Sequence, residues 1–307
     1  MKACVVSGLW RLTAEQVKFE IGKVKIGGLP GERPTVLVGS IFYNKHSILK
    51  DEAKGEFDRE RAEELIKRQE EFSDKTGNPH MLDVVGSTPE AIKRFLDFVS
   101  SKTDSPLLLD GVTPSIRIAG LDYIKEVGLK NPIIYNSLLP EYKKEELDKI
   151  KEAKVKNAVL LAFNTKEFTS EGRIKAIRKL IPVAKEAGLE KLLIDTAVID
   201  IPSLGMAYRA IYELKSEFGL PTGCGAHNAI GTWRGLRTKM GRQAMHPCMA
   251  VAGAITLAAG ADFVLYGPIE YADYVFPAVS MVDAAFAQLQ IEKGKMPDPK
   301  HPIFRIA

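Results

Sequence analysis

Short apolar runs that end in one polar side chain recur along this chain of 307 residues, and amphipathic segments follow them. The clearest run is residues 106–114, Pro-Leu-Leu-Leu-Asp-Gly-Val-Thr-Pro, where three leucines lead into Asp110. An unbroken apolar run between turn signals is typical of a strand covered on both faces, as in a parallel sheet. Asp110 is therefore expected at the C-terminal end of a parallel strand, where α/β folds build their sites.

Eight strand–helix units repeat this pattern. The predicted strands span residues 35–42, 79–85, 106–110, 132–135, 157–163, 191–194, 221–226 and 262–266. Predicted helices span residues 58–74, 143–154, 172–187, 204–218, 243–259 and 272–290, and Ile92, Phe95, Leu96 and Val99 form the apolar stripe of another. Eight such units predict an α/β fold, the closed TIM (β/α)8 barrel. The alternative is an open doubly wound sheet, but residues 39–42 do not supply its GxGxxG turn.

The segment before the first unit has a different period. Residues 17–28 alternate apolar and polar positions around Gly22-Lys23, which predicts a small β-hairpin that plugs the barrel floor. The sequence thus divides into an N-terminal extension with a hairpin, residues 1–30, and a barrel, residues 31–307.

Composition and charge exclude several classes. The formal charge is +4 with a pI near 8.7, far from the strong basic excess of a dedicated nucleic-acid binder. Three cysteines, Cys4, Cys224 and Cys248, with no CxxC spacing argue against a disulfide framework or a zinc site. The N-terminus lacks an apolar signal core, and the apolar tract 249–261 is too short to span a bilayer. We therefore expect a cytoplasmic protein without a transmembrane segment.

Six of the predicted strands end in an acid or an amide. These residues are Asp83, Asp110, Asn136, Asn164, Asp195 and Asn228. Some of them can simply cap helices and fill turns. As a set, they predict a polar mouth for an uncharged heterocycle with several N–H groups and a carbonyl, because one carboxylate can accept two ring donors and amides satisfy mixed edges. No His–carboxylate cluster suggests a bound metal, and of the five histidines only His227 is expected at the mouth.

Several longer motifs make the prediction more specific. They are residues 27–32 (Gly-Gly-Leu-Pro-Gly-Glu), 39–46 (Gly-Ser-Ile-Phe-Tyr-Asn-Lys-His), 74–78 (Asp-Lys-Thr-Gly-Asn), 134–137 (Ile-Tyr-Asn-Ser) and 263–270 (Phe-Val-Leu-Tyr-Gly-Pro-Ile-Glu). In this order they resemble the H subunit of tetrahydromethanopterin S-methyltransferase, and equally its soluble relatives that use methyltetrahydrofolate. The resemblance covers the chain from about residue 19 to the last helix and implies a pterin-binding TIM barrel.

The resemblance also implies roles for the strand-end residues. By strand order, Asp110, Asn136, Asp195 and Asn228 match the family's pterin-holding acids and amides, and Asp83 resembles its strand-two motif; Asn164 is carried over from its position alone. One departure is residues 110–114, Asp-Gly-Val-Thr-Pro, where many relatives have Asp-Ser-Thr-Ser. The implied reaction moves the N5-methyl group of a reduced pterin to cobalt(I).

In this interpretation Asn228 contacts N5, while Asp110 and Asp195 anchor the ring and assist its protonation. The substrate is tetrahydrofolate or tetrahydromethanopterin in methylated form. The chain has no Asp-x-His-x-x-Gly motif, so a separate corrinoid (cobalamin) protein is expected to dock over the mouth. The resemblance further implies a homodimer. The basic residues Arg234, Arg237, Lys239 and Arg242 are either a solvated loop or a contact for an acidic partner or the pterin's anionic tail.

Two rival functions remain open at this point. A dihydropteroate synthase would share the fold but is expected to carry a basic pair after strands seven and eight, where residues 267–270 end in Glu270. A pterin-binding subunit without catalysis of its own is the second rival.

Overall fold

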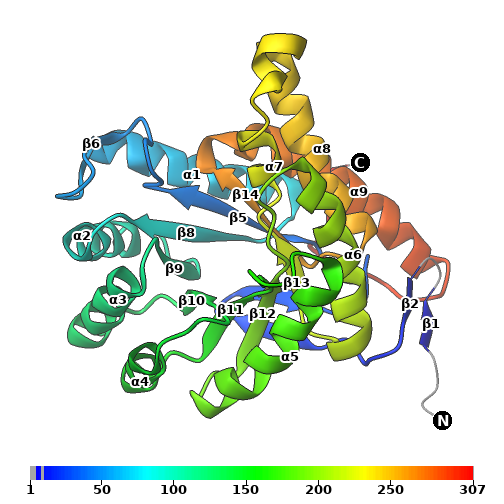
Figure 1. Ribbon diagram of the computed structural model, residues 1–307. Helices are drawn as coiled ribbons and strands as arrows, with labels where there is room; N and C mark the ends of the chain where they lie inside the picture. Colours follow the sequence, from blue (N-terminus) through cyan, green and yellow to red (C-terminus); the bar gives the residue numbers. More distant parts are fainter. Residues whose placement is uncertain (1–4, 8–9, 307) are drawn as a thin grey trace.

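Eight parallel strands close into a barrel with helices around it (Figure 1). The computed structural model describes residues 5–7 and 10–306. The barrel strands are β5 (Val36–Ile41), β8 (His80–Gly86), β9 (Leu107–Gly111), β10 (Ile133–Leu138), β11 (Asn157–Leu161), β12 (Lys191–Asp195), β13 (Thr222–Cys224) and β14 (Phe263–Pro268). Each pairs with its neighbour in sequence, and β14 pairs with β5 to close the ring. The predicted TIM barrel is confirmed.

The helices lie outside the barrel. They are α1 (Arg59–Thr76), α2 (Pro89–Ser100), α3 (Pro114–Val127), α4 (Lys144–Glu152), α5 (Ser170–Glu186), α6 (Ile201–Phe218), α7 (His227–Gly231), α8 (Met245–Ala258) and α9 (Ala272–Ile291). Sequence-local signals set their ends: Thr88 caps α2 by accepting from the Ala91 N–H, and Gly77 ends α1 in the left-handed region. Helix and strand residues between the layers form the larger part of the core.

The segment after β13 differs from the prediction. The seventh strand is three residues long. Between it and α8 lie α7, a π-helical turn (Leu236–Met240) and a 3-10 turn (Arg242–Ala244), where residues 233–239 were expected as a basic loop. Within this short strand the backbone runs close to β14, since a Cβ on Gly223 would lie 2.1 Å from the Phe263 carbonyl oxygen. We call residues 232–244 the arm; Figure 1 shows it and α8 projecting above the barrel.

The hairpin of β3 (Lys18–Ile21) and β4 (Val24–Gly27) closes the floor of the barrel, as predicted. Its side chains Ile21, Val24 and Ile26 are buried among inward-facing residues of the strands, including Val38 and Leu193. Gly22 turns the hairpin with a φ of 58°. The hairpin therefore fills this end of the barrel interior with apolar side chains.

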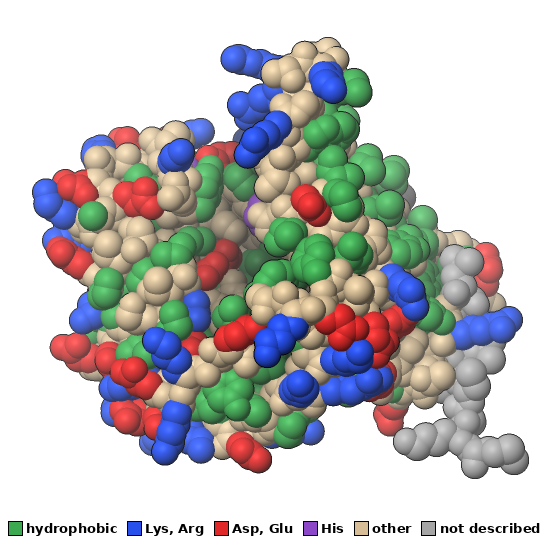
Figure 2. Space-filling model, in the orientation of Figure 1, with side chains coloured by type: hydrophobic (Ala, Val, Ile, Leu, Met, Phe, Trp, Pro, Cys, Tyr) green, Lys and Arg blue, Asp and Glu red, His purple; other side chains and the backbone are tan. Residues whose placement is uncertain are grey.

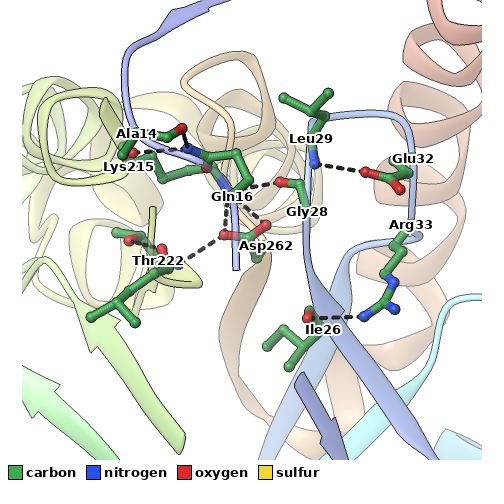
Figure 3. Close-up of polar contacts among 11 residues, drawn as sticks. Ala14, Gln16, Ile26, Gly28, Leu29, Glu32, Arg33, Lys215, Thr222 and Asp262 are labelled. Atoms are coloured by element: carbon green, nitrogen blue, oxygen red, sulfur yellow. Dashed lines mark hydrogen bonds and ion pairs between the residues drawn. The ribbon is translucent and has the colours of Figure 1, made fainter. Parts of the chain in front are cut away.

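A buried ion pair fastens this floor to the barrel wall (Figure 3). Lys215 of α6 donates to both carboxylate oxygens of Asp262, at 2.7 and 2.6 Å, and to the Gly28 carbonyl at 3.3 Å. Asp262 also accepts from the Thr222 N–H at 2.8 Å. The glycines of the motif at residues 27–32 serve this turn, since a Cβ on Gly27 would lie 2.2 Å from the Val17 carbonyl oxygen.

Two further hairpins were not predicted. Strands β1 (Val5–Ser7) and β2 (Trp10–Leu12) pair beside α6, and β6 (Leu49–Asp51) pairs with β7 (Glu56–Phe57) in the loop after β5. Cys4, and most of the stretch in which we expected no signal segment, lie outside the described residues. Among the helices that the structure describes, none combines the length and apolar character needed to cross a membrane.

Candidate functional site

A cavity of about 1010 Å³ opens at the C-terminal ends of the barrel strands. Five of the six predicted site residues line it: Asp83, Asp110, Asn136, Asp195 and Asn228. They come from β8, β9, β10, β12 and the start of α7. In Figure 2 the hollow lies below the projecting arm, with acidic side chains inside it. The structure thus brings together residues that are up to 145 positions apart in sequence, from 83 to 228.

Asp83 and Asn136 form a buried polar pair. The Asn136 amide donates to Asp83 Oδ1 at 3.1 Å, and the Ser40 hydroxyl donates to Asp83 Oδ2 at 2.7 Å. Both Asp83 and Asn136 are buried, at 2% and 7% exposure. Ser40, on β5, was not predicted as a site residue. It fixes the carboxyl of Asp83 between two donors and so sets which edge of Asn136 faces the cavity.

A buried arginine stands behind Asp110. The Gly111 N–H donates to Asp110 Oδ1 at 2.6 Å, while Arg117 of α3 donates to the Gly111 carbonyl at 2.7 Å. Arg117 also pairs with Glu146 at 3.0 Å and donates to the Tyr135 hydroxyl at 3.0 Å. This network fixes the turn after β9, so the departure at residues 110–114 leaves Asp110 facing the cavity.

Asp195 is held in a parallel way. The Ala197 N–H donates to Asp195 Oδ1 at 2.7 Å, and Arg173 of α5 donates to the Thr196 and Ala197 carbonyls at 2.8 and 3.0 Å. Ala197 has a φ of 57°, a left-handed conformation that costs a non-glycine residue energy. The buried Arg173 compensates by binding both carbonyls of that turn. Neither arginine was predicted, because a lone Arg in an amphipathic helix carries no sequence signal.

Three carboxyl groups therefore face one cavity. Burial raises the pKa of Asp110 and of Asp195 to about 6, against the opposing hydrogen bonds of Gly111 and Ala197. Burial and the nearby charge of Asp110 also raise the pKa of Asp83. Like charges in one low-dielectric site cannot all ionise freely, so these carboxyl groups keep protons at higher pH than an ordinary aspartic acid does. The cavity can accept N–H donors and also supply a proton.

Asn228 and His227 begin α7 at the cavity wall. His227 Nδ1 lies 3.1 Å from the Leu265 carbonyl oxygen, and burial lowers the pKa of its ring, which keeps it neutral. Asn228 is exposed to the cavity, and its side chain makes no hydrogen bond to any residue that the structure describes. Its amide is therefore free to meet a ligand as donor or acceptor.

Asn164, in contrast, does not reach the cavity. Strand β11 ends at Leu161, which lines the wall, and the chain has turned away by residue 164. Asn164 Oδ1 accepts from the N–H groups of Lys166 and Glu167 at 3.0 and 3.1 Å, and its amide donates to the Gly172 carbonyl at 3.4 Å. These contacts are those of a turn-forming Asn, so the expectation of a site residue here is corrected.

A second histidine lies next to the mouth, contrary to the expectation that only His227 would. The Phe42 N–H donates to His46 Nδ1 at 3.0 Å, and His46 Nε2 faces Glu270 Oε1 at 2.9 Å. The hydroxyl of Tyr43, a cavity residue, donates to the same oxygen at 3.1 Å. Burial raises the pKa of Glu270, but these donors and the Glu270 N–H outweigh it and lower the pKa overall.

This cluster was visible only as part of a motif. Tyr43 and His46 belong to residues 39–46, and Glu270 ends residues 263–270, two of the stretches that carry the resemblance. Their chemistry depends on β5 and β14 being neighbours, which follows from barrel closure. Among the residues described, no group of three or more His, Cys, Asp or Glu side chains is placed to hold a metal ion.

Comparisons with known proteins agree on the family. A sequence model described as "Tetrahydromethanopterin S-methyltransferase MtrH subunit" matches residues 14–297. The chain is 41% identical to the H subunit of tetrahydromethanopterin S-methyltransferase from Methanothermobacter thermautotrophicus, over 97% of this chain and 100% of that protein. It is 37% identical to the H subunit of a putative mtx methyltransferase from Methanosarcina mazei, over 96% of this chain and 99% of that protein.

A solved structure shows the same fold at lower similarity. Dihydropteroate synthase from Xanthomonas albilineans in complex with 7,8-dihydropteroate matches with a TM-score of 0.59 and 19% identity, over 88% of this chain and 98% of that one. The family model and the near-full-length relatives confirm the resemblance to the H subunit of tetrahydromethanopterin S-methyltransferase. This chain belongs to the family of tetrahydromethanopterin S-methyltransferase MtrH subunits.

Proposed function

We propose that this protein transfers the N5-methyl group between a reduced pterin and the cobalt(I) of a corrinoid held by a separate protein. The observation that supports it most directly is the meeting of Asp83, Asp110, Asn136, Asp195 and Asn228 in one cavity. Carboxylates accept the adjacent N–H groups of a pterin ring, and amides match its mixed edges. The pterin is methyltetrahydrofolate or methyltetrahydromethanopterin; the names of the curated relatives favour the second.

The chemical difficulty is the leaving group. In the proposed step the electron pair of cobalt(I) forms the cobalt–carbon bond, the carbon–nitrogen pair returns to N5, and N5 ends as N–H. A proton must therefore reach N5 as the bond breaks. Asn228 is the proposed contact with N5, because its unengaged amide can face either protonation state. Asp110 and Asp195, with pKa values raised to about 6, are the proposed source of that proton.

The corrinoid enters this scheme as the cargo of a partner, docked over the mouth. The relatives are each named as one subunit of a methyltransferase, which supports association with other subunits. We also propose a homodimer, formed through α8 and α9. These helices expose Val251, Ile255 and Met281 at 62%, 46% and 63%, and α8 carries no Asp, Glu, Lys or Arg. An apolar face of this kind suits a second copy of itself.

Two variants test the transfer. Asp110→Ala should abolish binding of methyltetrahydrofolate and methyltetrahydromethanopterin, because pterin N–H groups left unpaired in a buried site cost about 1–3 kcal/mol each. Asn228→Ala should bind either pterin with an affinity within a few-fold of the parent's. Its rate of methyl transfer to a cobalt(I) corrinoid should fall by at least about 10²-fold. Calorimetric titration measures binding, and methylcobalt absorbance in single-turnover mixing measures transfer.

Asn164→Ala is the matched control, a strand-end amide that faces away from the cavity, and it should behave like the parent in both assays. If Asp110→Ala and Asn228→Ala both bind and transfer like the parent, the assignment fails. If the parent binds methylpterin but never methylates cobalt(I), the chain is a pterin-binding subunit without catalysis.

A further inference from the structure

The cavity is charged in two zones. Its inner wall, at the strand ends, carries Asp83, Asp110 and Asp195. The charged residues of its rim are all cations: Lys45 on the loop after β5, and Arg234 and Arg237 on the arm. Figure 2 shows several basic side chains of the projecting segment along its left edge, above the hollow. The two zones select for a ligand with N–H donors at one end and negative charge at the other.

The side chains of the two arginines are exposed. Within residues 10–306, neither the Arg234 nor the Arg237 side chain makes a hydrogen bond or an ion pair. In contrast, Arg68, Arg94 and Arg178 on other helices each pair with a carboxylate at 2.6–2.7 Å. Arg237 also acts on the cavity wall, since its charge opposes the burial and the Glu270 charge that raise the pKa of Tyr271. A pair of free guanidinium groups directed at a cavity is a suitable receptor for a carboxylate or a phosphate.

The arm is anchored, so the two arginines are presented at a fixed place. Leu236 between them is fully buried, and its N–H donates to the Trp233 carbonyl at 3.1 Å. The Thr232 hydroxyl is 2.8 Å from the Asn228 carbonyl and 3.1 Å from the Ile199 carbonyl. Arg234 and Arg237 therefore continue the segment that begins at Asn228. A ligand whose reacting atom meets Asn228 has its outer end beside this pair.

Cavity size agrees with this arrangement. At about 1010 Å³ it reaches the upper end of the range that encloses a whole drug-sized ligand, and a bicyclic ring alone would leave much of it empty. We infer that Arg234 and Arg237 form a subsite for the anionic tail of the pterin substrate, an inference that rests on the proposed function. The substrate class is then a reduced methylpterin with a carboxylate- or phosphate-bearing tail.

The test compares ligands with and without that tail. The probes are methyltetrahydrofolate, which ends in a glutamate dicarboxylate, methyltetrahydromethanopterin, which ends in an anionic tail of its own, and a tailless 5-methyltetrahydropterin. In the double variant Arg234→Ala/Arg237→Ala, calorimetry should show roughly threefold to thirtyfold weaker binding of the tailed ligands, as two exposed charge pairs allow. Binding of the tailless ring should change less than twofold. Raising the salt concentration should weaken tailed ligands more in the parent than in the variant.

The matched control is Lys239→Ala/Arg242→Ala, which removes the same charge from the same arm at positions that do not line the cavity. It should leave all three affinities unchanged. If the arginine variant loses equal affinity for tailed and tailless ligands, or loses none for either, the proposed tail subsite is wrong. Unchanged pterin affinity with slower transfer to the corrinoid protein would also overturn it and assign the arginines to the partner. Asp110→Ala, run in parallel, separates the two hypotheses: if it loses every ligand while the arginine variant loses none, only the tail subsite fails.

Discussion

At the scale of single residues, the site is built from groups that are costly to bury. Asp83, Asp110 and Asp195 lose water at the strand ends, and each recovers only one or two hydrogen bonds from the protein. The heterocycle proposed as ligand would supply further donors. Burying these carboxyl groups therefore costs stability, and the buried arginines Arg117 and Arg173 hold the adjacent turns in place by binding their carbonyls.

The cost of burying Asp110 predicts that the stability of the folded protein depends on pH. Its pKa is about 6 in the folded state, against an ordinary value of 3.8. At a pH between these two values, the folded protein keeps a proton on Asp110 that the unfolded chain has released. Stability then falls as pH rises from about 4 to 6 and remains lower above that window. Asp110→Asn removes the cost, so the variant should be more stable than the parent at pH 8 by up to about 3 kcal/mol, while losing pterin binding.

Chemical denaturation at pH 4 and pH 8 measures the difference, which should nearly vanish at the lower pH. Asp104→Asn is the control, because the hydrogen bond and charge of Lys23 lower the pKa of Asp104 and its removal should give no gain at pH 8. An Asp110→Asn variant that is less stable than the parent at pH 8 would show that the carboxylate is stabilised by its surroundings instead.

At the scale of elements, the floor and the mouth are fixed by different devices. The floor uses a hairpin, tight glycine turns and the buried Lys215–Asp262 pair, whereas the mouth uses strand ends and helix-borne arginines. The motif at residues 27–32 belongs to the floor. So does the motif at residues 74–78, where Asn78 donates to Asp283 and to the Thr35 carbonyl. Part of what marks this family in sequence thus maintains the scaffold.

Substitutions of Lys215 and Asp262 should have strongly non-additive effects on the free energy of unfolding. Lys215→Met leaves the Asp262 carboxylate buried without its cation and should cost about 3–5 kcal/mol of unfolding free energy. The double variant Lys215→Met/Asp262→Asn removes both charges, keeps an acceptor for the Thr222 N–H, and should recover at least about 1 kcal/mol of that loss. Lys23→Met, at an exposed pair with Asp104, should change stability little. Denaturant titration of the parent, Lys215→Met, Asp262→Asn and the double variant measures the coupling, and additive effects would contradict it.

The features that could be predicted from the sequence are those whose signals lie in a short stretch of residues. The apolar runs before Asp83, Asp110 and Asp195 predicted both the strands and the residues at their ends, because period and turn chemistry are local. Asn164 was misplaced, since three residues past a strand end are enough for a turn to redirect a side chain. The arm was expected as a loop, because residues 233–242 lack a helical apolar stripe. The Glu270–His46 contact required two strands far apart in the sequence to be neighbours, which only barrel closure supplies.

At the scale of the whole molecule, one side of the barrel remains apolar. Figure 2 shows hydrophobic side chains running from the projecting segment down over the region of α8 and α9. Along α9 the charged residues are Asp273, which pairs with Arg68, and the buried Asp283. Because α8 continues directly from the arm, a homodimer through this face would also fix the arm of each subunit over its own cavity.

This arrangement predicts that a charge on the face breaks the dimer. Val251→Glu/Met281→Glu should weaken self-association by more than about a hundredfold, since each carboxylate would be buried unpaired at several kcal/mol. Sedimentation equilibrium at micromolar concentration should find the parent as a dimer and the double variant as a monomer. Val127→Glu places the same charge at an apolar residue that is 50% exposed on the C-terminal end of α3, away from this face, and should leave the dimer intact.

A monomeric parent, or a double variant that still dimerises, would contradict the proposed interface. If the dimer also fixes the arm, the monomeric variant should bind the tailless ring like the parent but bind methyltetrahydrofolate more weakly.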